Sequence, residues 1–232
     1  MTIEFDDVDV LTFDCYGTLI DWEAGLLAAL RPILGRGGTS PTDDDLLEAY
    51  AAVEAELQAG PYRRYRDVLA EGLRRLADAY AVALTPDQVE AFSRSVEDWP
   101  AFGDSADALR RLAHRFRLGV ITNCDDDLFA ASQRRLGVTF DWVISAEQVR
   151  SYKPSLRNFE VALERIGVPL ERVLHVAQSL YHDHVPARTL GLRTAWIHRR
   201  HDRPGFGATP PASATPDLVV PSMAAFADLA VS

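Results

Sequence analysis

Hydrophobic residues follow two different periods along this chain. Residues 9–14, Asp-Val-Leu-Thr-Phe-Asp, form an apolar, β-prone run that ends abruptly at Gly17-Thr18, which predicts a buried strand running into a loop. Residues 22–99 are instead rich in Ala, Leu, Glu and Arg, with apolar positions at helical spacing. Breaks divide this region into about four predicted helices, and they fall at Pro41-Thr42, Gly60-Pro61 and Thr85-Pro86.

From residue 100 onward, strand and helix patterns alternate. The expected strands are 117–122, 142–145, 173–177, 193–197 and 217–220, and the expected helices are 104–114, 126–136, 155–166, 183–190 and a short C-terminal one. An irregular loop is expected at 199–216, where Arg, His, Pro and Gly accumulate. Strand–helix alternation predicts a doubly wound α/β fold, in which helices cover both faces of a parallel sheet.

The strand at 9–14 has to join this sheet, although the helical region separates it from the other strands. The sequence therefore predicts two units. An α/β core is formed by residues 1–20 and 100–232, and an all-helical cap at 21–99 is inserted after the first strand.

Charge and composition narrow the possible partners. The chain has 232 residues, a formal net charge of −10 and a pI near 5.0, which argues against nucleic acid as the main partner. A small anionic substrate remains compatible, because a local pocket can be positive on an acidic surface. With only two cysteines, no signal-peptide pattern and no apolar run of about 18 residues, we expect a cytoplasmic protein without membrane association.

Polar residues follow several of the predicted strands. In an open parallel sheet, ligands bind at the carboxyl ends of the strands. The residues at those ends are Asp14, Thr122-Asn123, Lys153, Gln178-Ser179 and Asp183. Taken singly, each has an ordinary explanation as a turn, a cap or a surface charge. Together, a carboxylate beside a cation indicates a possible nucleophile.

Four motifs in order resemble those of the haloacid dehalogenase superfamily. Phe-Asp14-x-x-Gly-Thr resembles the first, Ile-Thr122-Asn the second and Tyr-Lys153-Pro the third. Residues 176–187 resemble the fourth, which retains an acid at Asp183. The resemblance covers essentially the whole chain. It implies a Rossmann-like core with a helical cap and a covalent mechanism in which Asp14 is the nucleophile.

Two departures from the superfamily's phosphatases bear on the chemistry. Tyr16 stands where they carry a general acid/base Asp, and Gln178 stands where they carry a metal-binding acid. Mg²⁺ prefers anionic oxygen ligands, so we expect no metal and no cofactor. Asp14 and Asp183 could still hold a weak Mg²⁺ site, and a Mg²⁺-dependent phosphatase is the main alternative. A non-catalytic binding protein on the same scaffold is a third.

The dehalogenase branch, in which an aromatic residue replaces that acid, resembles this chain more closely. By that resemblance, Asp14 displaces halide from a short 2-halo acid and water then hydrolyses the aspartyl ester to release a 2-hydroxy acid. Lys153 would keep Asp14 ionised. Asp183 would orient or deprotonate the water, with His182 and His184 as weaker options. The substrate carboxylate would be held by Thr122, Asn123 and the amides of Cys15 and Tyr16.

The substrate and its leaving group are less well defined. The dehalogenase branch usually has a Ser-Asn pair and an aromatic in the fourth motif, whereas this chain has Gln178-Ser179 and Tyr181 as substitutes. A related enzyme that breaks a strained C–N bond would use the same parts. Arg64 is the candidate halide contact, but a basic helix face paired with nearby acids is the favoured explanation for any one arginine of this segment. Homodimerisation is common in the resembling branch.

Overall fold

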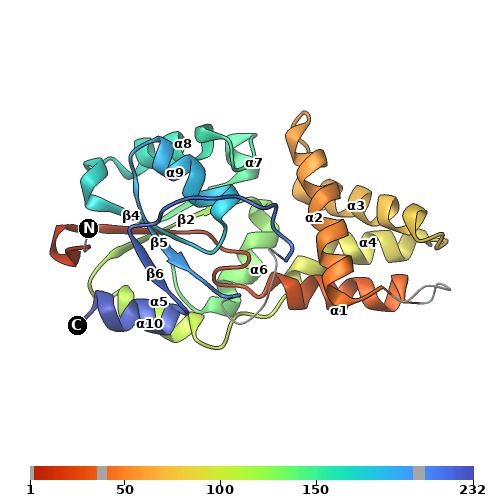
Figure 1. The fold of residues 1–232 in the computed structure, drawn as a ribbon, viewed down its shortest axis with the longest axis horizontal. Coiled ribbons are helices and arrows are strands. Elements are labelled where there is room, and N and C mark those ends of the chain that lie inside the picture. Colours follow the sequence, from red (N-terminus) through yellow and green to blue (C-terminus); the bar gives the residue numbers. More distant parts are fainter. Residues whose placement is uncertain (1–2, 36–40, 201–206) are drawn as a thin grey trace.

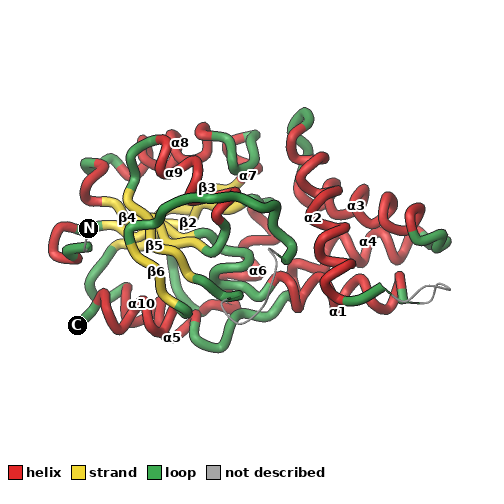
Figure 2. Tube along the Cα trace, viewed as in Figure 1, coloured by secondary structure: helices red, strands yellow, loops and turns green. Residues whose placement is uncertain are grey.

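A single six-stranded parallel sheet forms the centre of the computed structural model, which describes residues 3–35, 41–200 and 207–232. The strand order is β3-β2-β1-β4-β5-β6, as Figure 2 shows in yellow. The strands are β1 (Val10–Phe13), β2 (Arg117–Thr122), β3 (Trp142–Ser145), β4 (Val173–Ala177), β5 (Arg193–Ile197) and β6 (Leu218–Val220). The predicted doubly wound α/β class is confirmed.

Helices cover both faces of this sheet (Figure 1). One face packs against α5 (Ser105–Leu112), α6 (Asp126–Leu136) and α10 (Met223–Ala230). The other packs against α8 (Leu156–Ile166) and α9 (Val185–Thr189). All four residues of β1 are buried, and Val10 faces one layer while Leu11 and Phe13 face the other. An apolar run of this kind is what a central parallel strand requires.

Four α-helices lie between β1 and α5 within the described residues and gather at one end of the molecule (Figure 1). They are α1 (Trp22–Leu34), α2 (Asp43–Ala59), α3 (Tyr65–Ala79) and α4 (Pro86–Arg94). The predicted helix start at Thr85-Pro86 is confirmed, because Thr85 accepts a hydrogen bond from the Gln88 amide and Pro86 is the first helical residue. We refer to this helical region as the cap.

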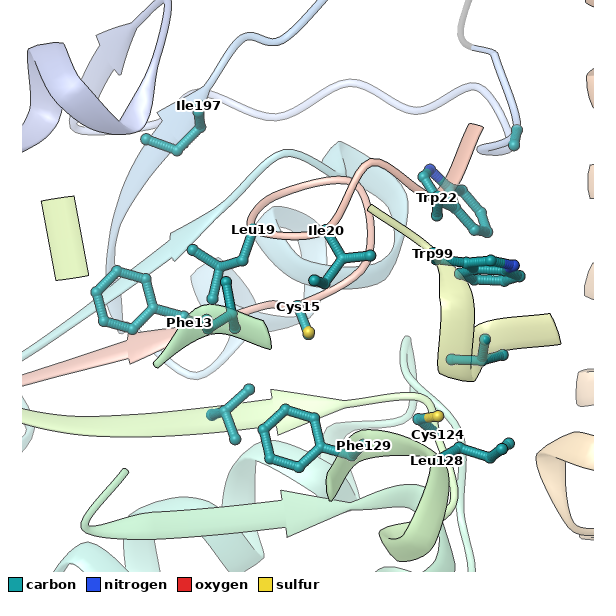
Figure 3. Packing of buried hydrophobic residues seen from close by; sticks show 14 of the residues in the cluster. Phe13, Cys15, Leu19, Ile20, Trp22, Trp99, Cys124, Leu128, Phe129 and Ile197 are labelled. Carbon is teal, nitrogen blue, oxygen red and sulfur yellow. The ribbon is translucent and has the colours of Figure 1, made fainter. Parts of the chain in front are cut away.

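The two chain crossings between cap and core run side by side. The Asp21 amide donates to the Pro100 carbonyl at 2.8 Å, and Ile20 pairs with Ala101 in an antiparallel bridge. One continuous apolar cluster extends from the sheet through these crossings into the cap. Figure 3 shows part of it, with Phe13, Leu19, Ile20, Trp22, Trp99 and Phe129 labelled.

Strands are added to the sheet in opposite directions on the two sides of β1, which pairs with β2 on one side and β4 on the other. Phe13 lies opposite Val120 and Val176, so the three strands end at the same level. Residues that follow them therefore meet at one edge of the sheet, beneath the cap. This is the topological switch point at which open α/β sheets bind ligands.

Two details differ from the sequence-based expectation. A short helix, α7 (Ala146–Val149), follows β3 directly, and the helix expected at 183–190 begins with a π-helical turn at Leu180–His184. Single-turn 3₁₀ helices occupy Phe5–Asp7, Ser95–Asp98 and Leu170–Arg172. The expected irregular loop at 199–216 includes 201–206, which lie outside the described residues. None of the helices in the described ranges is long and apolar enough to cross a membrane.

Candidate active site

Asp14 follows β1 directly and is almost fully buried, with 6% of its surface exposed. Its Oδ1 accepts a hydrogen bond from Lys153 Nζ at 2.8 Å, and its Oδ2 accepts one from Thr18 Oγ1 at 2.6 Å. Thr18 Oγ1 in turn accepts the Gln178 amide proton at 2.8 Å, so its own proton is directed at Asp14. The carboxylate is thus fixed in orientation through both oxygens.

Lys153 Nζ lies between two carboxylates. It donates to Asp14 Oδ1, to Asp183 Oδ1 at 2.7 Å and to the Ile121 carbonyl at 2.8 Å, which uses all three of its N–H groups. Burial disfavours the ammonium, but the charges of Asp14 and Asp183 outweigh it and raise the pKa of Lys153. Burial raises the pKa of Asp14, with Lys153 and Thr18 opposing that rise.

Asp183 lies in the π-helical turn after β4 and is fully buried. Its Oδ1 is also 3.0 Å from His175 Nε2, while His175 Nδ1 is 3.0 Å from Thr12 Oγ1. Burial alone would raise the pKa of Asp183, but Lys153 and His175 lower it below the ordinary value. Asp183 Oδ2 is buried and has no hydrogen-bond partner among the described residues. It is therefore free to accept a hydrogen bond from a bound water.

Asn123 positions the lysine backbone. Its Oδ1 accepts the Lys153 amide at 2.7 Å, and its Nδ2 donates to the Lys153 carbonyl at 3.0 Å. The same Nδ2 is 3.3 Å from Gln58 Oε1 on α2, which links the core to the cap. The peptide bond between Lys153 and Pro154 is cis.

A small cavity of about 30 Å³ lies above these groups, between core and cap. Its core wall includes Asp14, Lys153 and Asp183, and its cap wall includes Glu54, Gln58 and Tyr65. The remaining lining residues are Tyr16, Trp22, Asn123, Ser179, His182 and Thr209. A buried carboxylate and a buried ammonium on one wall make this cavity the candidate site for a polar ligand.

Sequence reasoning placed seven of these lining residues at the site: Asp14, Tyr16, Asn123, Lys153, Ser179, Asp183 and, as a weaker option, His182. Tyr16 packs edge-on against Trp99, and its hydroxyl is 3.0 Å from Ser132 Oγ. Ser179 Oγ is 3.1 Å from His182 Nδ1 and accepts the His182 amide at 2.9 Å. Burial lowers the pKa of His182 to about 4, so this imidazole is neutral at pH 7.

Other expected site residues lie outside the cavity wall. Cys15 is buried in the apolar cluster (Figure 3), where burial raises its thiol pKa. Gln178 contributes its backbone: its amide donates to Thr18 and its carbonyl accepts from Trp196 Nε1. Tyr181 is half-buried and packs edge-on against His182. Thr122 is buried, and its hydroxyl has no hydrogen-bond partner among the described residues.

Arg64 also lies outside the cavity, contrary to the expectation that it contacts the leaving group. Its guanidinium is 3.5 Å from Asp125, 3.3 Å from Asp127 and 3.3 Å from Glu147. Asp125 is buried at the start of α6 and accepts the Tyr65 and Arg66 amides. These acids attract the arginine toward the side of the core. The structure therefore supports the alternative interpretation, in which the basic segment is paired with acids.

Sequence reasoning missed several residues that contact the site. Thr18 and His175 hold the two carboxylates. Thr18 belongs to the first motif but was given no role of its own, and a His in an apolar strand carries no signal in a single sequence. Glu54 and Gln58 are one helical turn apart on α2 and therefore share a face. A Glu among the buried positions of that helix was the signal that could have identified them.

In the observed geometry, the two carboxylates expected to hold a Mg²⁺ ion are paired with Lys153. The ammonium of Lys153 already lies between Asp14 Oδ1 and Asp183 Oδ1, the two oxygens best placed for a cation. Asp14 Oδ2 accepts the Thr18 hydroxyl proton. Within the described ranges, no group of three or more His, Cys, Asp or Glu residues is arranged to hold a metal ion.

Comparison with known proteins identifies the family of this chain. A family model described as haloacid dehalogenase-like hydrolase matches residues 8–180. The chain is 26% identical over 227 residues to (S)-2-haloacid dehalogenase from Pseudomonas putida, and the match covers 94% of each chain.

Two solved structures share the fold. L-2-haloacid dehalogenase from Xanthobacter autotrophicus, solved with chloropropionic acid covalently bound, superimposes with a TM-score of 0.78 at 21% identity, over 96% of this chain and 98% of that one. The putative hydrolase YfnB from Bacillus subtilis, solved with bound magnesium, gives a TM-score of 0.77 at 21% identity, over 96% and 98% of the two chains. The family match spans most of the sequence and includes the first three motifs, and the protein therefore belongs to the haloacid dehalogenase-like hydrolases.

Proposed function

We propose that the protein is a metal-independent hydrolase that displaces halide from short 2-haloalkanoic acids through an aspartyl ester and yields 2-hydroxy acids. The observation that carries this proposal is the buried Asp14 carboxylate, oriented by Lys153 and Thr18 at the base of a small cavity. Two relatives support it: one is named (S)-2-haloacid dehalogenase, and the other was solved with chloropropionic acid covalently bound.

In the first step, an oxygen of Asp14 attacks C2 of the substrate. A C–O bond forms, the C–halogen bond breaks, and its electron pair leaves with the halide. Lys153 keeps Asp14 ionised, because protonating the carboxylate would remove one of the two charges that stabilise the buried ammonium. Since Asp14 is held through both oxygens, little reorganisation is needed before attack.

The substrate carboxylate needs donors other than Lys153, whose three N–H groups are already used. Thr122 is the last residue of β2, directly before Asn123. Its buried hydroxyl has no hydrogen-bond partner among the described residues. We assign carboxylate binding to the Thr122 hydroxyl and the backbone amides of Cys15 and Tyr16, whereas Asn123 Nδ2 already donates to the Lys153 carbonyl and to Gln58. Donors fixed in a buried loop bind an anion without ordering long side chains.

In the second step, water attacks the ester carbonyl, Asp14 leaves as a carboxylate, and the 2-hydroxy acid is released. Asp183 Oδ2 is the unpaired acceptor that orients this water. His182 lines the cavity in its neutral form and is the second candidate. His184 is less suitable, because its Nε2 bonds to the Ala177 carbonyl and the residue does not line the cavity.

Halide release from a panel of short 2-halo acids, with EDTA present throughout, tests the proposal. We expect release by the wild-type protein and loss of it in Asp14→Asn. The matched control is Asp107→Asn, an exposed aspartate on α5 that pairs with Arg110. Phosphate release from esters that requires Mg²⁺, with no halide release from any halo acid, would contradict the proposal and favour the phosphatase alternative.

A further inference from the structure

Among the described residues, the cap places a carboxyl group, and no arginine or lysine, on the wall of the cavity. Glu54 on α2 is 4% exposed and lines the cavity together with Gln58 and Tyr65. Its Oε1 accepts the Tyr50 hydroxyl at 3.1 Å and the Tyr65 hydroxyl at 2.9 Å. A carboxyl group among buried apolar residues is costly unless it is neutral or paired. No cation forms an ion pair with Glu54 in the part of the chain that the structure describes.

Burial raises the pKa of Glu54 to about 7, while the two tyrosine hydroxyls pull it in the opposite direction. The titratable groups around it come from several elements. Those packed near it are Tyr50 on α2, Tyr65 on α3, Cys124 after β2 and Tyr152 after α7. Those that face it from the core wall of the cavity are Asp14, Tyr16, Lys153, His182 and Asp183. The only cation in this set is Lys153, which is already held by two carboxylates.

The hydrogen bonds of Glu54 determine where its acid proton lies. Oε1 already accepts two tyrosine protons. Oε2 has no hydrogen bond to any described residue, and it is the oxygen left for the cavity. In the neutral form, the proton therefore resides on Oε2, and the cap presents an O–H donor to whatever occupies the cavity.

We propose that Glu54 contacts the departing halide and stabilises it as a neutral acid, through a hydrogen bond from Oε2. This inference rests on the proposed displacement at C2. Negative charge accumulates on the halogen as the bond to C2 breaks, so a donor aimed at it strengthens in the transition state. The proton stays on Glu54 throughout. An ionised Glu54 repels the halide, and Arg64, the other candidate, is held away from the cavity by three acids.

The first test is the pH dependence of halide release in the wild type, Glu54→Gln and Glu56→Gln. Glu56 is an exposed residue of α2 that pairs with Arg75, and its variant should behave as the wild type does. We expect wild-type kcat/KM to fall by about tenfold per pH unit above about pH 7. In Glu54→Gln, which keeps an N–H donor but cannot ionise, we expect a lower rate at pH 6 and no such fall. The same alkaline fall in both proteins would overturn the inference.

The second test needs no turnover. Carboxyl ¹³C NMR of glutamate-labelled protein should show one resonance that titrates near pH 7 and is missing in Glu54→Gln. Sodium bromide should move this midpoint upward relative to the same concentration of sodium gluconate, whose anion is too large for the cavity, because a halide that binds the acid form stabilises it. No bromide-dependent shift would overturn the inference. A wild type that shows the shift but releases no halide would contradict the proposed substrate alone.

Discussion

Gly25, on α1 just after the chain first crosses from core to cap, lies directly against the indole ring of Trp99, where the chain crosses back to the core. A Cβ at residue 25 would be 2.3 Å from Trp99 Cγ, closer than two carbon atoms that are not bonded to each other can approach. Trp99 is 1% exposed and also packs edge-on against Tyr16, which lines the cavity. The absence of a side chain at one position thus sets how closely the two crossings approach each other.

Substituting this glycine should therefore destabilise the fold. We expect Gly25→Ala to lower the free energy of unfolding by about 1–3 kcal/mol, because the Trp99 ring must shift in a close-packed region. Gly72→Ala on α3 is the matched control, since its Cβ would lie at an ordinary 3.4 Å from Tyr50 and should be neutral or slightly stabilising. Urea unfolding measured by tryptophan fluorescence compares them. Equal effects of the two changes would refute the packing argument.

Thr18 should matter to catalysis through its hydroxyl alone. Thr18→Ala removes the donor to Asp14 Oδ2 and the acceptor for the Gln178 amide, so we expect kcat to fall by about 10²-fold. Thr18→Ser retains the hydroxyl and should keep most of the activity. Steady-state halide release measures both variants, and a Thr18→Ser protein as impaired as Thr18→Ala would show that the methyl group matters instead.

Replacing Asp183 should separate the two chemical steps. Asp183→Asn retains an oxygen that can accept from Lys153 but loses the charge that orients water, so hydrolysis of the ester should slow by at least about 10²-fold. The aspartyl ester on Asp14 should then accumulate and appear as an added mass on the intact protein and on its Asp14 peptide. Unchanged multiple turnover without any adduct would assign the water to another residue, and His182 is the next candidate.

The stability of the protein should depend on pH through Glu54. Its pKa is about 7 in the folded state and near 4.5 when exposed, so between these values the folded state holds a proton that the unfolded state has lost. The stability contribution of Glu54 is therefore complete below about pH 4.5 and declines as pH rises toward 7. Relative to Glu54→Gln, the wild type should lose about 3 kcal/mol from pH 5 to pH 8. Denaturant unfolding at both pH values tests this, and a constant difference would contradict it.

The sheet was predictable because each of its strands is a short apolar run bounded by turn residues. Asp14, Lys153 and Asp183 were predictable for a related reason: parallel strands end at one edge, so the residues that follow them converge. The orientation of the cap helices toward the cavity was not predictable. Whether Glu54 or Arg64 faces the cavity depends on how α2 and α3 rotate against the core, and acids far along the chain, such as Asp125 and Glu147, decide where Arg64 goes.

The central position of β1 has a consequence for how the chain is made. Val10 lies opposite Arg117 on one side and Val173 on the other, so both partners of the first strand come from much later in the sequence. Loop closure over such separations slows folding. During synthesis, the apolar segment that ends at Asp14 is made before both of its partner strands and remains unpaired at least until the cap and β2 have been produced. Deleting the cap should shorten that exposure.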